Sequence, residues 1–287
     1  MTVSPRRYLL SGAVALIVIG AALTVPAGPA QAVANPYRNQ GVSANDASSP
    51  KDAVASCTGN DRLVGMGAKI EGGQGEVLLT GMVPDLATDS VTATGVENVA
   101  VGTAWQAIAW AICAPVGTEP ANLAVEDDVA VAVPASPKTV DAQCQGNSIV
   151  YSVGFILTED DGKVAIDEVE FDPAFTSGSV TAYTNNGLAG SWGLQTYVIC
   201  GAPSPNPSLQ TWTSARNSIT PKTETTPVCG GTTEVHGVGA VIDGARGDAS
   251  ITTLNPRPQL TTGEATVREI GTTTDNWEME VQAFCSD

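Results

Sequence analysis

The sequence is poor in the residues that carry most catalytic and metal chemistry. Among its 287 residues there is one histidine, His236, and aromatic residues make up only 5%. One histidine cannot supply the several nitrogen ligands of a typical zinc site, and no Gly-x-Ser-x-Gly elbow supports a Ser-His-Asp triad. No phosphate loop, Cys-x-x-Cys pair or dinucleotide fingerprint occurs. We therefore expect no enzyme, no metal and no cofactor, and we interpret His236 as a packing residue on a strand.

Long apolar runs are absent after the first residues of the chain. Arg6 and Arg7 precede an apolar stretch from Tyr8 to Val25, and Ala30-Gln31-Ala32 offers small residues for cleavage. This pattern predicts a signal peptide over residues 1–32, with a transmembrane anchor as the alternative because the run is nearly long enough to span a bilayer. We expect a secreted, extracellular protein with no membrane association after cleavage.

Positive charge is also scarce. The formal net charge is -17, and removal of Arg6 and Arg7 with the signal peptide changes it to -19. Such a surface repels nucleic acid and anionic polymers, so neither is an expected partner. Gly is plentiful, and Val, Ile and Thr dominate the apolar runs, which is typical of a β protein with many turns.

The six cysteines show an internal repeat. Three pairs, Cys57 with Cys113, Cys144 with Cys200 and Cys229 with Cys285, are each separated by 56 positions. A tryptophan stands eight positions before the second cysteine of each pair, a glycine ten positions after the first, and a Ser/Thr-Pro-Lys step precedes the first. Repetition at a fixed period indicates tandem structural units. We predict units over residues 33–117, 118–204 and 205–287.

Apolar residues alternate with polar ones inside each unit. From Trp277 to Cys285, the residues Trp277, Met279, Val281, Ala283 and Cys285 share one face of a strand. This period of two predicts antiparallel sheets packed on one side. In the first unit we expect about five strands, near 42–48, 62–70, 76–82, 91–95 and 105–113. A change of phase after Val164 and Ile166 predicts a β-bulge in the second unit.

The predicted fold is therefore all-β, with three tandem antiparallel β-sandwich-like repeats and one disulfide in each. Export favours disulfides, and repeat symmetry leaves two pairing schemes. We favour bonds within the units, 57–113, 144–200 and 229–285; the alternative joins 113 to 144, 200 to 229 and 57 to 285. A staple of this loop length stabilises a small domain by about 4 kcal/mol.

The repeated motifs resemble an actinobacterial family of secreted tandem-repeat β proteins. The likeness rests on Ser49-Pro50-Lys51, Cys57-Thr58-Gly59, Val64-Gly65-Met66-Gly67 and Ala111-Ile112-Cys113. It implies secretion and repeated all-β units, and it implies no particular activity. Threefold β repeats are also similar to the β-prism of egg-coat and lectin proteins, so a single pseudo-threefold β-prism is the alternative fold.

Acidic clusters are the only abundant reactive groups. Glu126-Asp127-Asp128 and Glu159-Asp160-Asp161-Gly162 could hold calcium through carboxylate oxygens, but neither recurs in all units or has EF-hand spacing. We interpret them as solvated turns. A glycosidase pair requires two carboxylates that face each other across a cleft, and no feature of the sequence selects such a pair.

Two aromatic residues are the candidate binding residues. Trp110 and Tyr197 fall on the face of the last strand opposite the cysteines, where the third unit has Gln282. An outward aromatic can form a platform for a sugar ring or a partner side chain; the alternative is a covered contact between sheets or units. The sequence thus predicts a secreted, non-enzymatic binding module for an extracellular glycan or a secreted protein. The alternative is a structural or protective extracellular protein.

Overall fold

The computed structural model describes residues 32–185, 190–271 and 273–287; the predicted signal peptide lies outside these residues except for residue 32. The described residues form eighteen strands and one short 3-10 turn, η1 (Gly73–Gly75). The all-β prediction is therefore confirmed. The first six strands are β1 (Tyr37–Val42), β2 (Lys51–Ser56), β3 (Arg62–Glu71), β4 (Val77–Asp85), β5 (Ser90–Glu97) and β6 (Gln106–Ala114).

The remaining strands form two further sets of six. The second set is β7 (Ala124–Val133), β8 (Lys138–Gln143), β9 (Ile149–Thr158), β10 (Val164–Phe171), β11 (Ser177–Thr184) and β12 (Trp192–Gly201). The third is β13 (Ser208–Thr213), β14 (Lys222–Thr225), β15 (Glu234–Asp243), β16 (Ala249–Pro256), β17 (Gly263–Glu269) and β18 (Glu278–Ser286). We call these sets units 1, 2 and 3. The expectation of about five strands in unit 1 was wrong, because six are present. In place of one strand over 42–48, the structure has two strands, 37–42 and 51–56, joined by a connection.

The same antiparallel pairing recurs in each unit. In unit 1 the strands form one sheet of order β1-β6-β3 and one of order β2-β5-β4. Units 2 and 3 repeat this with β7-β12-β9 and β8-β11-β10, then β13-β18-β15 and β14-β17-β16. The inward tryptophans Trp105, Trp192 and Trp277 are fully buried. Each unit is thus a sandwich of two three-stranded sheets.

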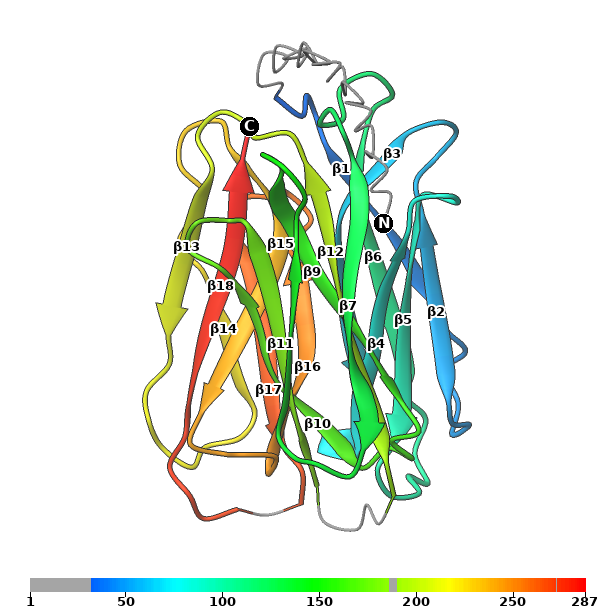
Figure 1. Ribbon diagram of the computed structural model, residues 1–287. Coiled ribbons are helices and arrows are strands. Elements are labelled where there is room, and N and C mark those ends of the chain that lie inside the picture. Colours follow the sequence, from blue (N-terminus) through cyan, green and yellow to red (C-terminus); the bar gives the residue numbers. More distant parts are fainter. Residues whose placement is uncertain (1–31, 186–189, 272) are drawn as a thin grey trace, which may run out of the picture.

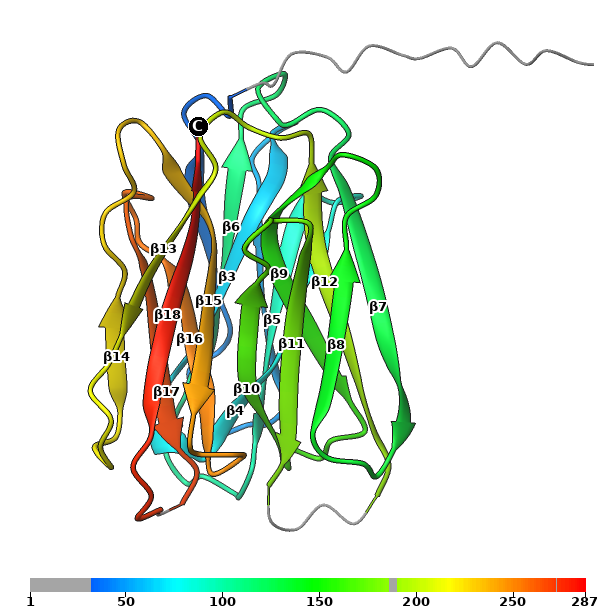
Figure 2. The ribbon, with the colours of Figure 1, turned by 60° about the vertical axis from the view of Figure 1, so that its left-hand side comes forward.

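Pairing between the units closes them into a ring. Strand β4 of unit 1 pairs with β9 of unit 2, β10 of unit 2 pairs with β15 of unit 3, and β16 of unit 3 pairs with β3 of unit 1. Three six-stranded sheets result, each built from two units, and a single parallel bridge between Gly237 and Met66 connects two of them. The units are therefore not separate beads: they are arranged around a pseudo-threefold axis, with all strands running roughly along one direction (Figures 1 and 2).

Glycines occur where the third strand of each unit approaches its neighbour. A Cβ atom on Gly67 would lie 2.5 Å from the carbonyl oxygen of Leu254, and one on Gly154 would lie 2.3 Å from that of Met82. On Gly239 it would lie 2.4 Å from the carbonyl oxygen of Val169. These are the glycines that recur ten positions after the first cysteine. Any larger residue there would force the units apart.

The Ser/Thr-Pro-Lys step places a lysine over each buried tryptophan. The Nζ atoms of Lys51, Lys138 and Lys222 lie 4.1, 4.6 and 4.6 Å from the ring centroids of Trp105, Trp192 and Trp277. All three lysines are buried and donate hydrogen bonds to backbone carbonyls. Burial lowers the pKa of Lys138 and Lys222. The motif is therefore structural: its lysine makes a cation-π contact with the tryptophan and donates hydrogen bonds to backbone carbonyl oxygens.

The predicted β-bulge in unit 2 is present. The register of β10 with β11 shifts between Ile166 and Glu168. Equivalent shifts occur in β4, between Leu79 and Gly81, and in β16, between Ile251 and Thr253. The bulge is therefore common to the three units, whereas the sequence indicated it for unit 2 alone.

Candidate functional site

The predicted platform residue Trp110 is covered. Its side chain is 4% exposed, and its indole Nε1 donates to Gln40 Oε1 at 3.1 Å. The guanidinium of Arg38 lies 4.9 Å from the centroid of the ring and donates to Pro256 O at 2.6 Å. Trp110 thus packs at the contact between units 1 and 3 and presents almost no surface to a ligand, which corrects the expectation of an outward platform at this position.

Tyr197 is partly covered. It lies in register with Gly154 on β9 and Asp127 on β7, and its side chain is half-buried. Burial, reinforced by the Asp127 carboxylate, raises the pKa of its phenol. At the equivalent position in unit 3, Gln282 Oε1 accepts a hydrogen bond from Phe171 N at 3.1 Å, across the contact between units 2 and 3. In two of the three units, the residue at this position, Trp110 in unit 1 and Gln282 in unit 3, therefore lies at a contact between units.

The six cysteines form the three bonds within units that the repeat favoured. Cys57 is bonded to Cys113, Cys144 to Cys200 and Cys229 to Cys285. The second cysteine of each pair lies near the end of β6, β12 or β18, and the arrowheads of these strands lie at the same end of the molecule (Figures 1 and 2). All three disulfides therefore lie at one end, which we call the disulfide end.

A chain of three adjoining hollows crosses the disulfide end, and we call it the end groove. The first, of about 490 Å³, lies beside Cys57 and shares Arg62 and Glu119 with the second, of about 350 Å³. The second shares Asn122 with the third, of about 380 Å³, which reaches Cys200. The connection between β6 and β7 thus forms the wall that joins units 1 and 2. Volumes of this size are typical of small-molecule sites.

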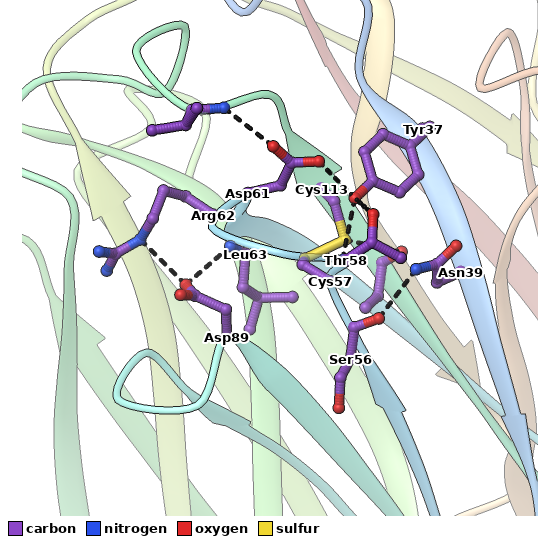
Figure 3. Close-up of a disulfide and its surroundings, with 12 residues drawn as sticks. Tyr37, Asn39, Ser56, Cys57, Thr58, Asp61, Arg62, Leu63, Asp89 and Cys113 are labelled. Carbon is purple, nitrogen blue, oxygen red and sulfur yellow. Dashed lines mark hydrogen bonds and ion pairs between the residues drawn. A yellow bond between two sulfur atoms is a disulfide. The ribbon is translucent and has the colours of Figure 1, made fainter.

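Arg62 occupies the centre of the end groove. It begins β3, and its Nε lies 3.0 Å from Asp89 Oδ1 in an ion pair whose N–H is not directed at the oxygen. Asp89 is held by Leu63 N, which donates to the same oxygen at 3.1 Å (Figure 3). The Arg62 side chain keeps 37% of its surface exposed, although its Nε is buried and its Nη2 donates to Leu86 O at 3.4 Å. The equivalent positions are Ile149 and Glu234, so this arginine is specific to unit 1.

The floor beside the first disulfide is fixed by a hydrogen-bonded cluster. Tyr37 Oη donates to Asp61 Oδ2 at 2.7 Å and lies 2.7 Å from Thr58 Oγ1 (Figure 3). Val116 N donates to Asp61 Oδ1 at 3.0 Å, which ties the β6–β7 connection to unit 1. Gly59 completes the Cys-x-Gly turn at a φ of 63°, a conformation that favours glycine. The wall of the groove is therefore held in place from both sides.

The lining of the end groove is polar and slightly acidic. Besides Arg62 it carries the carboxylates of Asp89, Glu119 and Glu126, with amides and hydroxyls from Asn60, Thr88, Asn122, Gln145, Asn147 and Ser148. One cation against three carboxylates disfavours an anionic ligand. Many short donors and acceptors along an open groove favour a hydroxyl-rich one. Sequence reasoning missed this site, because its residues come from four separate loops without a shared motif.

The remaining sequence candidates lie outside the groove or touch only its edge. His236 is fully buried against Tyr151, with ring centroids 5.4 Å apart, and burial lowers its pKa to about 4. Neither ring nitrogen has a hydrogen-bond partner in the described part of the chain. Of the acidic clusters, Glu126 lines the third hollow of the end groove. Within residues 32–185, 190–271 and 273–287, no group of three or more potential ligands is arranged to hold a metal ion.

Two comparisons, with protein-family models and with curated proteins, found no match. None of the helices in the described residues is long and apolar enough to cross a membrane.

Proposed function

We propose that this is a secreted, non-enzymatic binding module that takes a neutral or amino-bearing oligosaccharide in the end groove. The observation that carries the proposal is the row of three adjoining hollows that share Arg62, Glu119 and Asn122. A row of small polar hollows offers successive subsites to a linear chain of sugars. The three disulfides are consistent with an oxidising extracellular compartment.

The groove contacts sugars through hydrogen bonds. The partly exposed Arg62 side chain supplies charge-assisted donors at the centre, and Asp89 and Glu119 accept from hydroxyl or ammonium groups on either side. The excess of carboxylates disfavours uronic acids and sulfated sugars. Hydrogen bonds of this kind contribute about 1.5–3 kcal/mol each when they involve a charged group.

The test is a glycan array with the mature, oxidised protein, followed by calorimetry on any ligand retained. Arg62→Gln keeps a polar side chain of similar reach and removes the charge, so we expect its affinity to fall roughly 10- to 100-fold. Tyr197→Ala, on the outer face of β12, is the matched control and should leave the affinity unchanged. Loss of binding in Tyr197→Ala with none in Arg62→Gln would reject the end groove.

A structural or protective role is the second candidate. It is favoured by the ring of units, in which three disulfides and three pairings between units restrain the whole described chain. This role requires no ligand. Absence of any retained glycan, together with full resistance to extracellular proteases that is lost on reduction, would favour it over binding.

A further inference from the structure

The bulge residue of the fourth strand is buried in every unit. Thr80 in β4, Asp167 in β10 and Thr252 in β16 each stand 23 positions after the first cysteine of their unit. Each falls at the register shift of its strand, and each is at most 3% exposed. The same buried bulge position is therefore occupied by a hydroxyl group in two units and by a carboxyl group in unit 2.

The two threonines donate to the neighbouring strand. Thr80 Oγ1 donates to Thr94 O at 3.5 Å, and Thr252 Oγ1 donates to Thr266 O at 3.2 Å. A carboxyl group in this place can donate only in its protonated form. Asp167 Oδ1 has no hydrogen-bond partner among the described residues. A buried acceptor without a donor is costly, and an ionised one more so.

The surroundings of Asp167 are predominantly acidic. Glu168 is its neighbour on β10, and Asp243 acts on it from β15. Tyr183 on β11 and Arg246, in the turn after β15, also belong to this group of interacting charges. Burial above all, and then the Glu168 carboxylate, raise the pKa of Asp167 to about 7, although the Gly247 backbone N–H favours the charged form.

The carboxyl lies at one junction of the ring. Strand β10 pairs with β15 of unit 3 through Glu168 and Val169, the two residues after Asp167. We infer that the junction between units 2 and 3 is pH-sensitive: Asp167 is buried directly before the two residues through which β10 pairs with β15, and ionisation of its unsatisfied carboxyl group loosens this pairing. The other two junctions have threonine at the same place and do not respond. This regulation is independent of the end groove.

The direction of the effect follows from proton linkage. The folded protein keeps a proton on Asp167 up to a pKa of about 7, whereas the unfolded chain loses it near its ordinary value of about 3.9. Folding therefore binds a proton between these values, and stability falls as pH rises from about 4 to about 7. Above that range the loss is complete and constant.

The decisive variant is Asp167→Thr, which installs the residue of the other two units. Thermal unfolding of both proteins is followed from pH 4.5 to pH 8.5. Taking the difference in Tm at each pH removes the contribution of the other carboxylates, which both proteins share. We expect Asp167→Thr to gain several degrees at pH 8 relative to the parent protein and little at pH 4.5. A difference in Tm that stays constant across the range would overturn the inference.

Three further measurements locate the effect, and two of them, hydrogen exchange and an NMR titration, use the parent protein alone. In the parent protein, hydrogen exchange of residues 240–247, corrected for the intrinsic rate, should accelerate at least tenfold between pH 5 and pH 8, while residues 68–75 and 155–162 stay protected. Thr252→Asp should add a second pH-sensitive junction, between units 3 and 1, where β16 pairs with β3. A carboxyl titration of Asp167 by NMR with a midpoint below pH 5 would refute the proposal.

Discussion

Two junctions of the ring have the same backbone pairing but different side chains. Between units 3 and 1, Arg38 donates to Asn255 Oδ1 at 2.8 Å and covers the buried ring of Trp110. Between units 2 and 3, the equivalent of Trp110 is Gln282, which accepts from Phe171 N and donates to Glu280 Oε1 at 3.0 Å. The first junction is closed by an aromatic ring under a cation, and the second by a polar side chain.

The charged side chains around these two junctions also differ. Lys69 and Arg268 line a hollow of about 250 Å³ beside the first junction. At the second, burial raises the pKa of Glu170, helped by Glu168 and Glu280. The comparison teaches that backbone contact and side-chain chemistry are separable: glycines set how closely the units approach, and the side chains around them set the strength and pH response of the junction.

The largest expected effect distinguishes the two junctions directly. Trp110→Ala removes a buried ring and should lower the free energy of unfolding by about 3–5 kcal/mol. Gln282→Ala leaves Phe171 N without its acceptor and should cost about 1–3 kcal/mol. Denaturant unfolding measures both, with Trp110→Phe as an intermediate control. Equal losses in the two alanine variants would show that the aromatic ring does not distinguish the junctions.

A smaller effect should be the same at both junctions. Gly67→Ala and Gly239→Ala each place a methyl group within 2.5 Å of a carbonyl oxygen of the neighbouring unit. Overpacking of this kind costs about 1–3 kcal/mol. Gly59→Ala, a control with no atom within 4 Å of the added methyl group, tests the effect of a left-handed backbone alone. Substitutions at Gly67 and Gly239 that differ by more than about 2 kcal/mol would contradict a shared backbone requirement.

The smallest effect concerns the acidic junction alone. The raised pKa of Glu170 means that its ionisation disfavours the folded state, and this cost is present above its folded pKa and disappears as the pH falls. Glu280→Gln removes one neighbouring charge and should stabilise the protein at pH 7 by roughly 0.5 kcal/mol, less in high salt. Thermal unfolding at two salt concentrations measures this gain. A loss of stability would show that the Glu280 carboxylate is needed by Gln282.

Several features were predictable because they are local to a unit. Alternation along Trp277–Cys285 predicted a strand buried on one face, and the burial of Met279, Val281 and Ala283 agrees. The constant spacing of the cysteines favoured bonds within units, which are the bonds present. The bulge in β10 was visible as a change of phase between Ile166 and Val169.

The candidate site was not predictable in the same way. Trp110 has the sequence character of an outward aromatic, yet Arg38 of unit 1, which donates to Pro256 O of unit 3, lies over its ring. The end groove joins Arg62, Asp89 and Glu119, which come from unrelated loops and lack a shared pattern. Of the two alternatives that the sequence left for Trp110, an outward platform and a covered contact, the structure shows the covered contact.

The sequence by itself determined the threefold repeat of strands and their inward faces, because these depend on side-chain alternation and on spacings inside one unit. It favoured the disulfide within each unit but left a second pairing scheme open. Only the tertiary structure decided which residues meet across units. Closure of the ring brings Lys69 opposite Thr253 and Glu168 opposite Val241, pairs that are far apart in the chain. That closure also positions Arg38 over Trp110, since Arg38 donates to Asn255 and Pro256 of unit 3. It likewise brings Asp243 and the Gly247 backbone of unit 3 to Asp167.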